Sequence, residues 1–247
     1  MYRDDFYRLP ELYDLEYSGL DEDLEHYRAL ARSVDSVLEF GAGSGRLTVP
    51  MAETGTTITA VDLSKPMLAR LRQRVEENGL PIDIVHADFT TLALDERFPL
   101  VLMPFNAVHH VYEPERVLEV FEVVKRHMTP GGRFGIDLLI PNPDFFAREP
   151  DGVYEERVDA DPDGGRMRSW ENGYYDEITQ INHIRYHFKR ADGRLQSVNM
   201  PMRMFYPQEF LFLVRQAGFR LLQCDGDFQG TPLKRGAHKL VLVLTVD

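Results

Sequence analysis

The 247-residue chain has a single cysteine, Cys224, which excludes an internal disulfide and any metal site built from several cysteines. It also lacks long apolar runs, since its longest aliphatic stretch, Leu240 to Leu244, is far too short to span a bilayer. Basic residues are scarce, 28 Lys and Arg against 40 Asp and Glu, for a formal net charge of −12. Nucleic acid or an anionic membrane surface would require a cationic face. We therefore expect neither kind of partner.

Two further absences concern targeting and metals. The amino-terminal residues Met1-Tyr2-Arg3-Asp4-Asp5 lack the apolar core of a secretory signal, which together with the lone cysteine predicts a cytoplasmic location. No spaced cluster of histidines and carboxylates suggests a metal site. A chain of this length can bury a sizeable core, and we expect one domain with an insertion.

The stretch Val37 to Gly45 reads Val-Leu-Glu-Phe-Gly-Ala-Gly-Ser-Gly, an apolar strand that breaks into glycines at alternate positions. An apolar-periodic segment follows and predicts a helix. Glycines allow the backbone to turn sharply close to a ligand, and a helix start offers unpaired N–H groups. Such a strand, loop and helix unit favours a nucleotide site. Arg46 stands where the dinucleotide fingerprint requires its third glycine, which argues against a dinucleotide.

Two more predicted strands end in a carboxylate. Thr57 to Val61 is followed by Asp62, and Ile82 to Ala87 is followed by Asp88. At the carboxyl end of a neighbouring strand, an ionised Asp62 can accept both hydroxyls of a ribose. The alternative roles are a helix N-cap for Asp62, for which Ser64 is better placed, and a plain turn for Asp88.

A fourth predicted strand, Leu100 to Met103, leads to a segment with two adjacent histidines, His109 and His110. Ligands bind at this edge of an open α/β sheet. Adjacent residues cannot share one face of a helix or strand, so at most one of the two should point into a pocket.

Together these features resemble the class I S-adenosylmethionine-dependent methyltransferases: Glu39 and the glycine loop, Asp62, Asp88, and a Pro-Gly-Gly-Arg turn before the fifth strand. The chain is similar to the small-molecule type, in particular to sugar N-methyltransferases of natural-product pathways. The resemblance implies a Rossmann-like α/β fold, a doubly wound, seven-stranded, mostly parallel sheet whose last strand is antiparallel. It implies S-adenosyl-L-methionine as cofactor and a small-molecule acceptor with an N or O nucleophile.

The resemblance also implies roles for residues. Asp62 holds the ribose, Asp88 bonds the adenine amino group, and Leu63 or Met67 lies against the adenine. The full set of predicted cofactor contacts is Glu39, Gly41, Gly43, Gly45, Asp62, Leu63, Met67, Asp88, Phe89 and Phe105. The predicted catalytic residues are His110, Tyr13 and His109.

Two of these roles have alternatives. His110 acts as a base or orients the acceptor, or it merely bonds a backbone carbonyl. Tyr13, in a segment similar to the "Tyr-Asp" segment of small-molecule methyltransferases, faces the pocket or belongs to a helical cover.

We divide the chain into residues 1–150, a helical cap with the cofactor-binding core, 151–204, an antiparallel insertion, and 205–247, the rest of the core. The cap contains predicted helices at Pro10–Tyr17 and at Asp21–Arg32, the second with Asp21 as N-cap. In the insertion, two glycine turns separate three predicted strands. It would serve as a lid, in acceptor binding, or as a platform for a homodimer.

Two other functions compete with methyl transfer. One is an NAD(P)-dependent oxidoreductase on the same doubly wound fold, against which Arg46 argues. The other is a non-catalytic regulatory protein that binds S-adenosylmethionine, because intact cofactor residues do not prove turnover.

Overall fold

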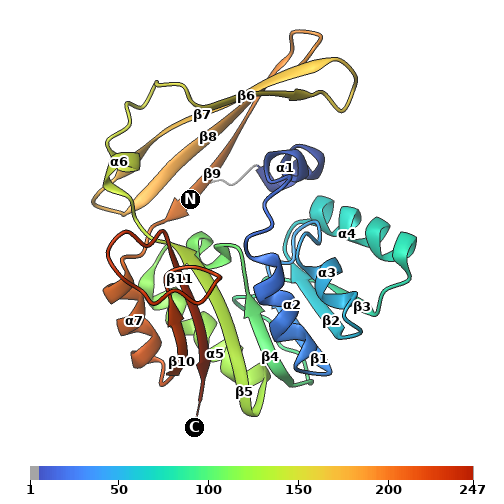
Figure 1. Ribbon diagram of the computed structural model, residues 1–247, viewed down its shortest axis with the longest axis vertical. Coiled ribbons are helices and arrows are strands. Elements are labelled where there is room, and N and C mark those ends of the chain that lie inside the picture. The colour runs from blue at the N-terminus through green and yellow to red at the C-terminus, as the bar shows by residue number, and fades with distance from the viewer. Residues whose placement is uncertain (1–5, 247) are drawn as a thin grey trace.

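The computed structural model describes residues 6–246, the side chains of residues 144 and 145 apart, and this part of the chain forms two β-sheets (Figure 1). The main sheet consists of β1 (Ser36–Phe40), β2 (Thr57–Asp62), β3 (Ile82–His86), β4 (Phe98–Met103), β5 (Met128–Leu139), β10 (Arg220–Asp225) and β11 (Lys239–Thr245). Its order is β10-β11-β5-β4-β1-β2-β3. Neighbouring strands from β5 to β3 are parallel, and β11 is antiparallel to both β5 and β10. The predicted doubly wound sheet with an antiparallel last strand is confirmed.

Strand β1 pairs with β2 on one side and with β4 on the other, so the strand order reverses beside it. In an open α/β sheet this switch point leaves a crevice at the carboxyl ends of the strands, where ligands bind. The loops that follow β1, β2 and β4 therefore all reach one edge of the sheet, which is the edge where the sequence places its candidate residues.

Helices cover both faces of the main sheet. The helical elements of the described residues are η1 (Phe6–Arg8), α1 (Pro10–Glu16), α2 (Leu24–Arg32), α3 (Thr48–Ala52), α4 (Lys65–Asn78), η2 (Ala107–His110), α5 (Pro114–His127), α6 (Pro143–Phe146) and α7 (Pro207–Gln216). Because side chains alternate along a strand, Leu100 and Leu102 of β4 pack on the α2–α4 side, while Val101 and Met103 pack on the α5–α7 side. Two apolar cores thus hold the sheet between its helices.

The second sheet is antiparallel and consists of β6 (Tyr154–Ala160), β7 (Arg166–Asp176), β8 (Ile181–Lys189) and β9 (Leu195–Arg203). It follows β5 in the chain and lies over the edge of the main sheet at which β5 ends, with α1 beneath it (Figure 1). A third apolar cluster joins the two parts, in which Phe6 and Leu12 pack with Tyr186 and Phe188 of β8. The space between the sheets is thereby closed by the N-terminal segment.

Three local predictions need correction. Helix α2 begins at Leu24, and Asp21 does not cap it. Asp23 occupies the N-cap position, and its carboxylate forms an ion pair with Arg46 (2.5 Å) instead of a cap. Strand β6 was not among the three predicted strands of the insertion, because its charged sequence shows little apolar alternation. The helix predicted at Pro10–Tyr17 matches α1.

Candidate active site

The loop after β1 turns at Gly41, Gly43 and Gly45, whose φ angles are 74°, 58° and 89°. Glycine adopts these positive angles without the strain that a side chain would add. A Cβ atom on Gly45 would lie 2.5 Å from Leu71 Cδ1 of α4, whereas a Cβ atom on Gly43 would meet nothing within 4 Å. The loop therefore packs against α4 at one glycine and faces open space at another, which leaves room for a ligand against its backbone.

Asp62, the last residue of β2, lies directly beside this loop. Its Oδ2 atom accepts a hydrogen bond from the Gly43 N–H (2.8 Å), and its Oδ1 atom accepts one from the Ser64 N–H (2.7 Å). Burial raises the pKa of Asp62, and these N–H groups oppose the rise. Each carboxylate oxygen can accept more than one bond. Asp62 thus fixes the loop and retains acceptor capacity for a diol, while Ser64 caps α4 as expected.

The residues predicted on the adenine side differ in their burial. Leu63 is 63% exposed, Phe89 stacks on Phe40 with ring centroids 5.8 Å apart, and Asp88 accepts one backbone N–H (2.8 Å). Met67 is fully buried in the apolar cluster between the sheets. It has no surface to offer an adenine ring, which corrects its assignment and leaves Leu63 as the apolar candidate.

Glu39 lies in β1 and lines a small cavity together with the glycine loop, Arg46, Tyr13 and Phe105. Its Oε2 atom is buried and has no hydrogen-bond partner among the described residues. Burial raises the pKa of Glu39 to about 7, outweighing the Thr48 hydroxyl and the Arg46 charge, which lower it. A buried carboxylate with an unused acceptor favours a ligand that brings a donor or a positive charge. The amino group of S-adenosylmethionine meets this requirement.

The turn after β4 is strained and is held by a buried carboxylate that sequence reasoning missed. Phe105 and Asn106 have positive φ angles of 52° and 64°. Asp137 of β5, fully buried, accepts hydrogen bonds from the Phe105 N–H (2.6 Å) and the Tyr27 hydroxyl (2.5 Å), and Lys239 Nζ lies 3.4 Å away. A carboxylate inside an aliphatic strand was the available signal in the sequence, because such a charge is buried only with partners.

His109 is a structural residue. Its Nε2 atom accepts a hydrogen bond from the Leu139 N–H (3.1 Å), so the proton is on Nδ1, which donates to the Arg203 carbonyl. The ring is fully buried, and burial lowers its pKa to about 4. Because both nitrogens bind backbone, His109 joins η2 to the ends of β5 and β9 and has no atom left for chemistry. This corrects its inclusion among the catalytic candidates.

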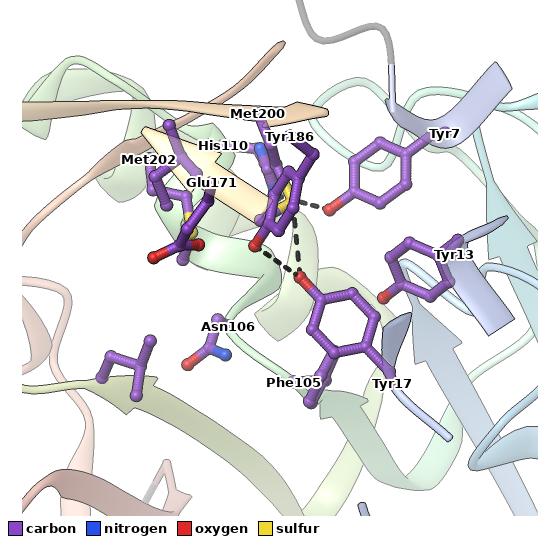
Figure 2. A pocket seen from close by; sticks show the side chains of 12 residues that line it. Tyr7, Tyr13, Tyr17, Phe105, Asn106, His110, Glu171, Tyr186, Met200 and Met202 are labelled. Carbon is purple, nitrogen blue, oxygen red and sulfur yellow. Dashed lines mark hydrogen bonds between the residues drawn. The ribbon is translucent and has the colours of Figure 1, made fainter. Parts of the chain in front are cut away.

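His110 lines the larger of the two cavities. Its Nε2 atom and the Tyr7 hydroxyl are 2.7 Å apart and hydrogen-bonded, and the two rings meet edge to face (Figure 2). Burial, with a smaller contribution from His109, lowers the pKa of His110 to about 4, so the imidazole is neutral at neutral pH. The structure therefore places His110 in the cavity and His109 outside it. Tyr7 was not predicted, since nothing in its own surroundings in the sequence marks it.

The larger cavity has a volume of about 210 Å³ and lies between the two sheets. Figure 2 shows its side chains converging from the N-terminal segment, the turn after β4 and the second sheet. Its lining residues are Tyr7, Tyr13, Tyr17, Phe105, Asn106, His110, Leu139, Glu171, Ile184, Tyr186, Met200 and Met202. Tyr13 and Phe105 line the small cavity as well, so the two cavities adjoin at these rings.

Helix α1 holds both parts of the site together. Asp14 forms ion pairs with Arg70 (3.1 Å) and Arg74 (2.6 Å) of α4, beside the glycine loop. Two residues further along α1, Glu16 forms an ion pair with Arg157 of β6 (2.6 Å) in the second sheet. Tyr13, on the same helix, lines both cavities, while its predicted catalytic role stays a prediction.

Among residues 6–246, no group of three or more histidines, cysteines or carboxylates is arranged to hold a metal ion. No helix in that range is long and apolar enough to cross a membrane.

Comparison with known proteins gives these observations a context. Residues 37–132, from β1 into the first part of β5, match a protein-family model described as "Methyltransferase domain". The cypemycin N-terminal methyltransferase of a Streptomyces species is 32% identical over 106 residues, which are 43% of this chain and 42% of that protein. The match thus spans less than half of either chain.

Two solved structures extend the likeness over nearly the whole fold. The CcbJ methyltransferase from Streptomyces caelestis has a TM-score of 0.83, with 21% identity and 99% of each chain covered. CalS10 from Micromonospora echinaspora, an amino pentose methyltransferase with bound S-adenosylmethionine, has a TM-score of 0.70, with 18% identity and 95% of this chain and 97% of that chain covered. These structures share the fold of this chain, second sheet included. The comparisons favour the methyltransferase prediction over the oxidoreductase.

Proposed function

We propose that the chain is an S-adenosylmethionine-dependent methyltransferase that methylates an amine nitrogen of a small molecule held between the two sheets, and the match of residues 37–132 to a methyltransferase domain supports this. S-adenosylmethionine is its cofactor, and when bound it supplies an electrophilic methyl group on a sulfonium. The glycine loop, Glu39, Asp62, Leu63, Asp88 and Phe89 are the residues that we assign to its binding.

The observation that carries the proposal is the junction of the two cavities. The small cavity, lined by the glycine loop and Glu39, suits the methionine part of the cofactor, and the larger one suits an acceptor. Tyr13 and Phe105 line both. An acceptor in the larger cavity would meet the methyl group at these two rings, and holding the reactants in line is the largest contribution such an enzyme can make.

The methyl transfer itself is simple in bonding terms. The lone pair of the neutral amine forms the N–C bond, the C–S bond breaks with its electron pair going to sulfur, and the N–H proton leaves afterwards to solvent. His110, with a pKa near 4, is a poor acceptor for the proton of an alkylammonium. We therefore assign it an orienting role, in which the neutral imidazole, fixed by Tyr7, positions the acceptor.

The test uses S-adenosylmethionine with a labelled methyl group and pairs of small cyclic compounds that differ only in an amine or a hydroxyl. We expect mass spectrometry to find the label on nitrogen in the amine member of a pair. Label on oxygen would show that the acceptor is an alcohol and not an amine. Binding of S-adenosylhomocysteine without transfer to any member would favour the non-catalytic regulatory protein. Self-association through the second sheet and a cytoplasmic location stay predictions.

A further inference from the structure

The lining of the larger cavity carries an unusual balance of charge. Among the described residues that line it there is one ionisable carboxylate, Glu171 of β7, and no lysine or arginine. The other polar lining groups are four tyrosine hydroxyls, one amide and the neutral imidazole of His110. Glu171 is only 7% exposed, so its charge lies inside the cavity and is shielded little by water.

Glu171 is only partly neutralised by protein. Arg148 Nη1 bonds its Oε1 atom (2.5 Å), and no other hydrogen bond to the carboxylate exists within the described residues. Arg148 is shared, because its Nη2 atom also bonds Glu155 (2.9 Å). Burial raises the pKa of the Glu171 carboxyl most strongly, Arg148 lowers it through its hydrogen bond and its charge, and Glu155 and Glu16 raise it further. Glu16 has its own partner in Arg157 (2.6 Å). The three carboxylates Glu16, Glu155 and Glu171 therefore outnumber the two guanidinium groups near this wall.

Asn106 supplies a second acceptor in the same cavity. It is 8% exposed, and its Oδ1 atom is buried without a hydrogen-bond partner among the described residues. Leaving a buried carbonyl unpaired is costly, and such a group in a native cavity indicates a missing partner. In Figure 2 the amide of Asn106 and the carboxylate of Glu171 lie on the same side of the cavity, opposite the rings of Tyr7 and Tyr13.

Aromatic rings complete the surroundings. Tyr17 and Tyr186 are linked through their hydroxyls (3.3 Å), and Tyr17 meets Phe105 edge to face with centroids 5.1 Å apart. Rings of this kind attract a cation to their faces. A negative wall, an unpaired carbonyl and several aromatic rings in one cavity all favour a cationic ligand.

We propose that the acceptor is recognised as a small organic cation: an ammonium group is held by Glu171 and Asn106 among the tyrosines, and phosphorylated acceptors are excluded. This rests on the proposed function and names its substrate class. Glu171 is a specificity residue that contacts the ammonium as the acceptor enters. The reacting nitrogen loses its proton to solvent before it attacks, or the ammonium belongs to a second, non-reacting amine of the same molecule. An anionic phosphate would meet a carboxylate here and no basic side chain.

The experiment measures binding instead of turnover and uses three related probes. Choline carries a permanent positive charge, dimethylbutanol replaces its nitrogen by carbon, and phosphocholine adds a phosphate. Each is titrated by calorimetry or ligand-observed NMR into the full chain saturated with S-adenosylhomocysteine. We expect choline to bind about tenfold or more tightly than dimethylbutanol, in line with a desolvated cation site, and phosphocholine to bind more weakly than choline.

Two variants locate the effect. In Glu171→Gln we expect the preference for choline over dimethylbutanol to fall to about twofold or less. The matched control is Glu156→Gln on β6, whose exposed carboxylate pairs with Arg168 (2.6 Å) outside the cavity and should leave the preference unchanged. If Glu171→Gln does not fold, as circular dichroism would show, Glu171→Asp keeps the charge but withdraws it, and a smaller loss is expected.

Three results would overturn the inference: equal affinity for choline and dimethylbutanol, tighter binding of phosphocholine than of choline, or an unchanged preference in the Glu171 variant. Failure of the proposed function is a separate outcome. It would show as no binding of S-adenosylhomocysteine, or as charge-dependent amine binding with no transfer of label. The probes therefore separate an incorrect substrate class from an incorrect activity.

Discussion

We assign the cofactor side of the site mainly to one continuous stretch, Glu39 to Phe89, in which three neighbouring strands end side by side, and Tyr13 and Phe105 from outside this stretch also line the small cavity. The acceptor side gathers residues 7–17, 105–110 and 171–202, which meet only because the second sheet and the N-terminal segment fold over the main sheet. The first region is built from backbone turns and carboxylates at strand ends, the second mainly from aromatic side chains. A family's shared chemistry can therefore be conserved locally while its substrate is chosen by contacts distant in sequence.

The strongest way to separate the two regions is to remove the carboxylate at the end of β2. Asp62→Ala takes away the acceptor that we propose for both ribose hydroxyls, together with the bond to Gly43, and charge-assisted bonds contribute about 1.5–3 kcal/mol each. We expect the affinity for S-adenosylhomocysteine to fall by about 100-fold or more in calorimetry. Asp83→Ala, on the exposed side of β3, is the control and should bind normally. Unchanged affinity in Asp62→Ala would remove Asp62 from the cofactor site.

Asp137 lies where the two regions join, and its replacement should damage both. Asp137→Asn keeps the size but leaves the Tyr27 hydroxyl, the Phe105 N–H and Lys239 with a weaker acceptor. Breaking a buried charged network of this kind costs about 3–5 kcal/mol. We expect a lower free energy of unfolding in urea and weaker binding of both S-adenosylhomocysteine and choline. A loss confined to one of the two ligands would show that the turn after β4 does not serve both cavities.

The adjacent histidines test the acceptor side alone. His110→Ala should lower turnover about 100-fold, roughly the effect of losing a group that orients the acceptor, with little change in stability or cofactor affinity. His109→Ala leaves the Leu139 N–H and the Arg203 carbonyl without partners, at about 1–3 kcal/mol each, and should lower the melting temperature. The assignment is wrong if His110→Ala keeps near-normal turnover while remaining folded. It is also wrong if His109→Ala folds normally and loses more activity.

Buried carboxyl and imidazole groups near the site should respond to pH in opposite directions. The pKa of Glu39 is about 7 in the folded protein, against a usual value of 4.5. Between these two pH values the folded protein holds a proton that the unfolded chain has lost, so the free energy of unfolding falls as the pH rises. His109 and His110 have folded pKa values near 4 against 6.5, so stability falls as pH drops from about 6.5 to 4. We expect Glu39→Gln to gain about 3 kcal/mol relative to wild type between about pH 4.5 and pH 8.

The measurement is the free energy of unfolding by urea at several pH values, without cofactor. A difference between Glu39→Gln and wild type that does not change with pH would contradict the burial of an unpaired Glu39 carboxylate.

The cofactor side could be predicted from the sequence because the patterns that mark its residues are local. Glycines at alternate positions, and carboxylates one residue after an apolar strand, keep their meaning whatever packs above them. Within this region the exception was Met67, whose apolar side chain fits either an adenine or a core. Only the packing of the N-terminal segment on α4 decides that it is buried.

The acceptor side could not be predicted in the same way. Glu171 and Tyr186 lie directly opposite each other on β7 and β8, and which face of the sheet they occupy depends on strand register and on how the sheet lies over η2. His110 could be predicted from its place after the fourth strand, but Tyr7, Asn106 and Asp137 act through contacts more than 30 residues away in the chain or through an unusual backbone turn.

If the two cavities meet as proposed, the methyl group passes from one region to the other at Tyr13 and Phe105. NMR of the protein with S-adenosylmethionine carrying a ¹³C-labelled methyl group can detect this passage. We expect nuclear Overhauser contacts from that methyl to the ring protons of both Tyr13 and Phe105. Contacts to the rings of Phe228 or Trp170 instead, which lie outside the lining of both cavities, would contradict it.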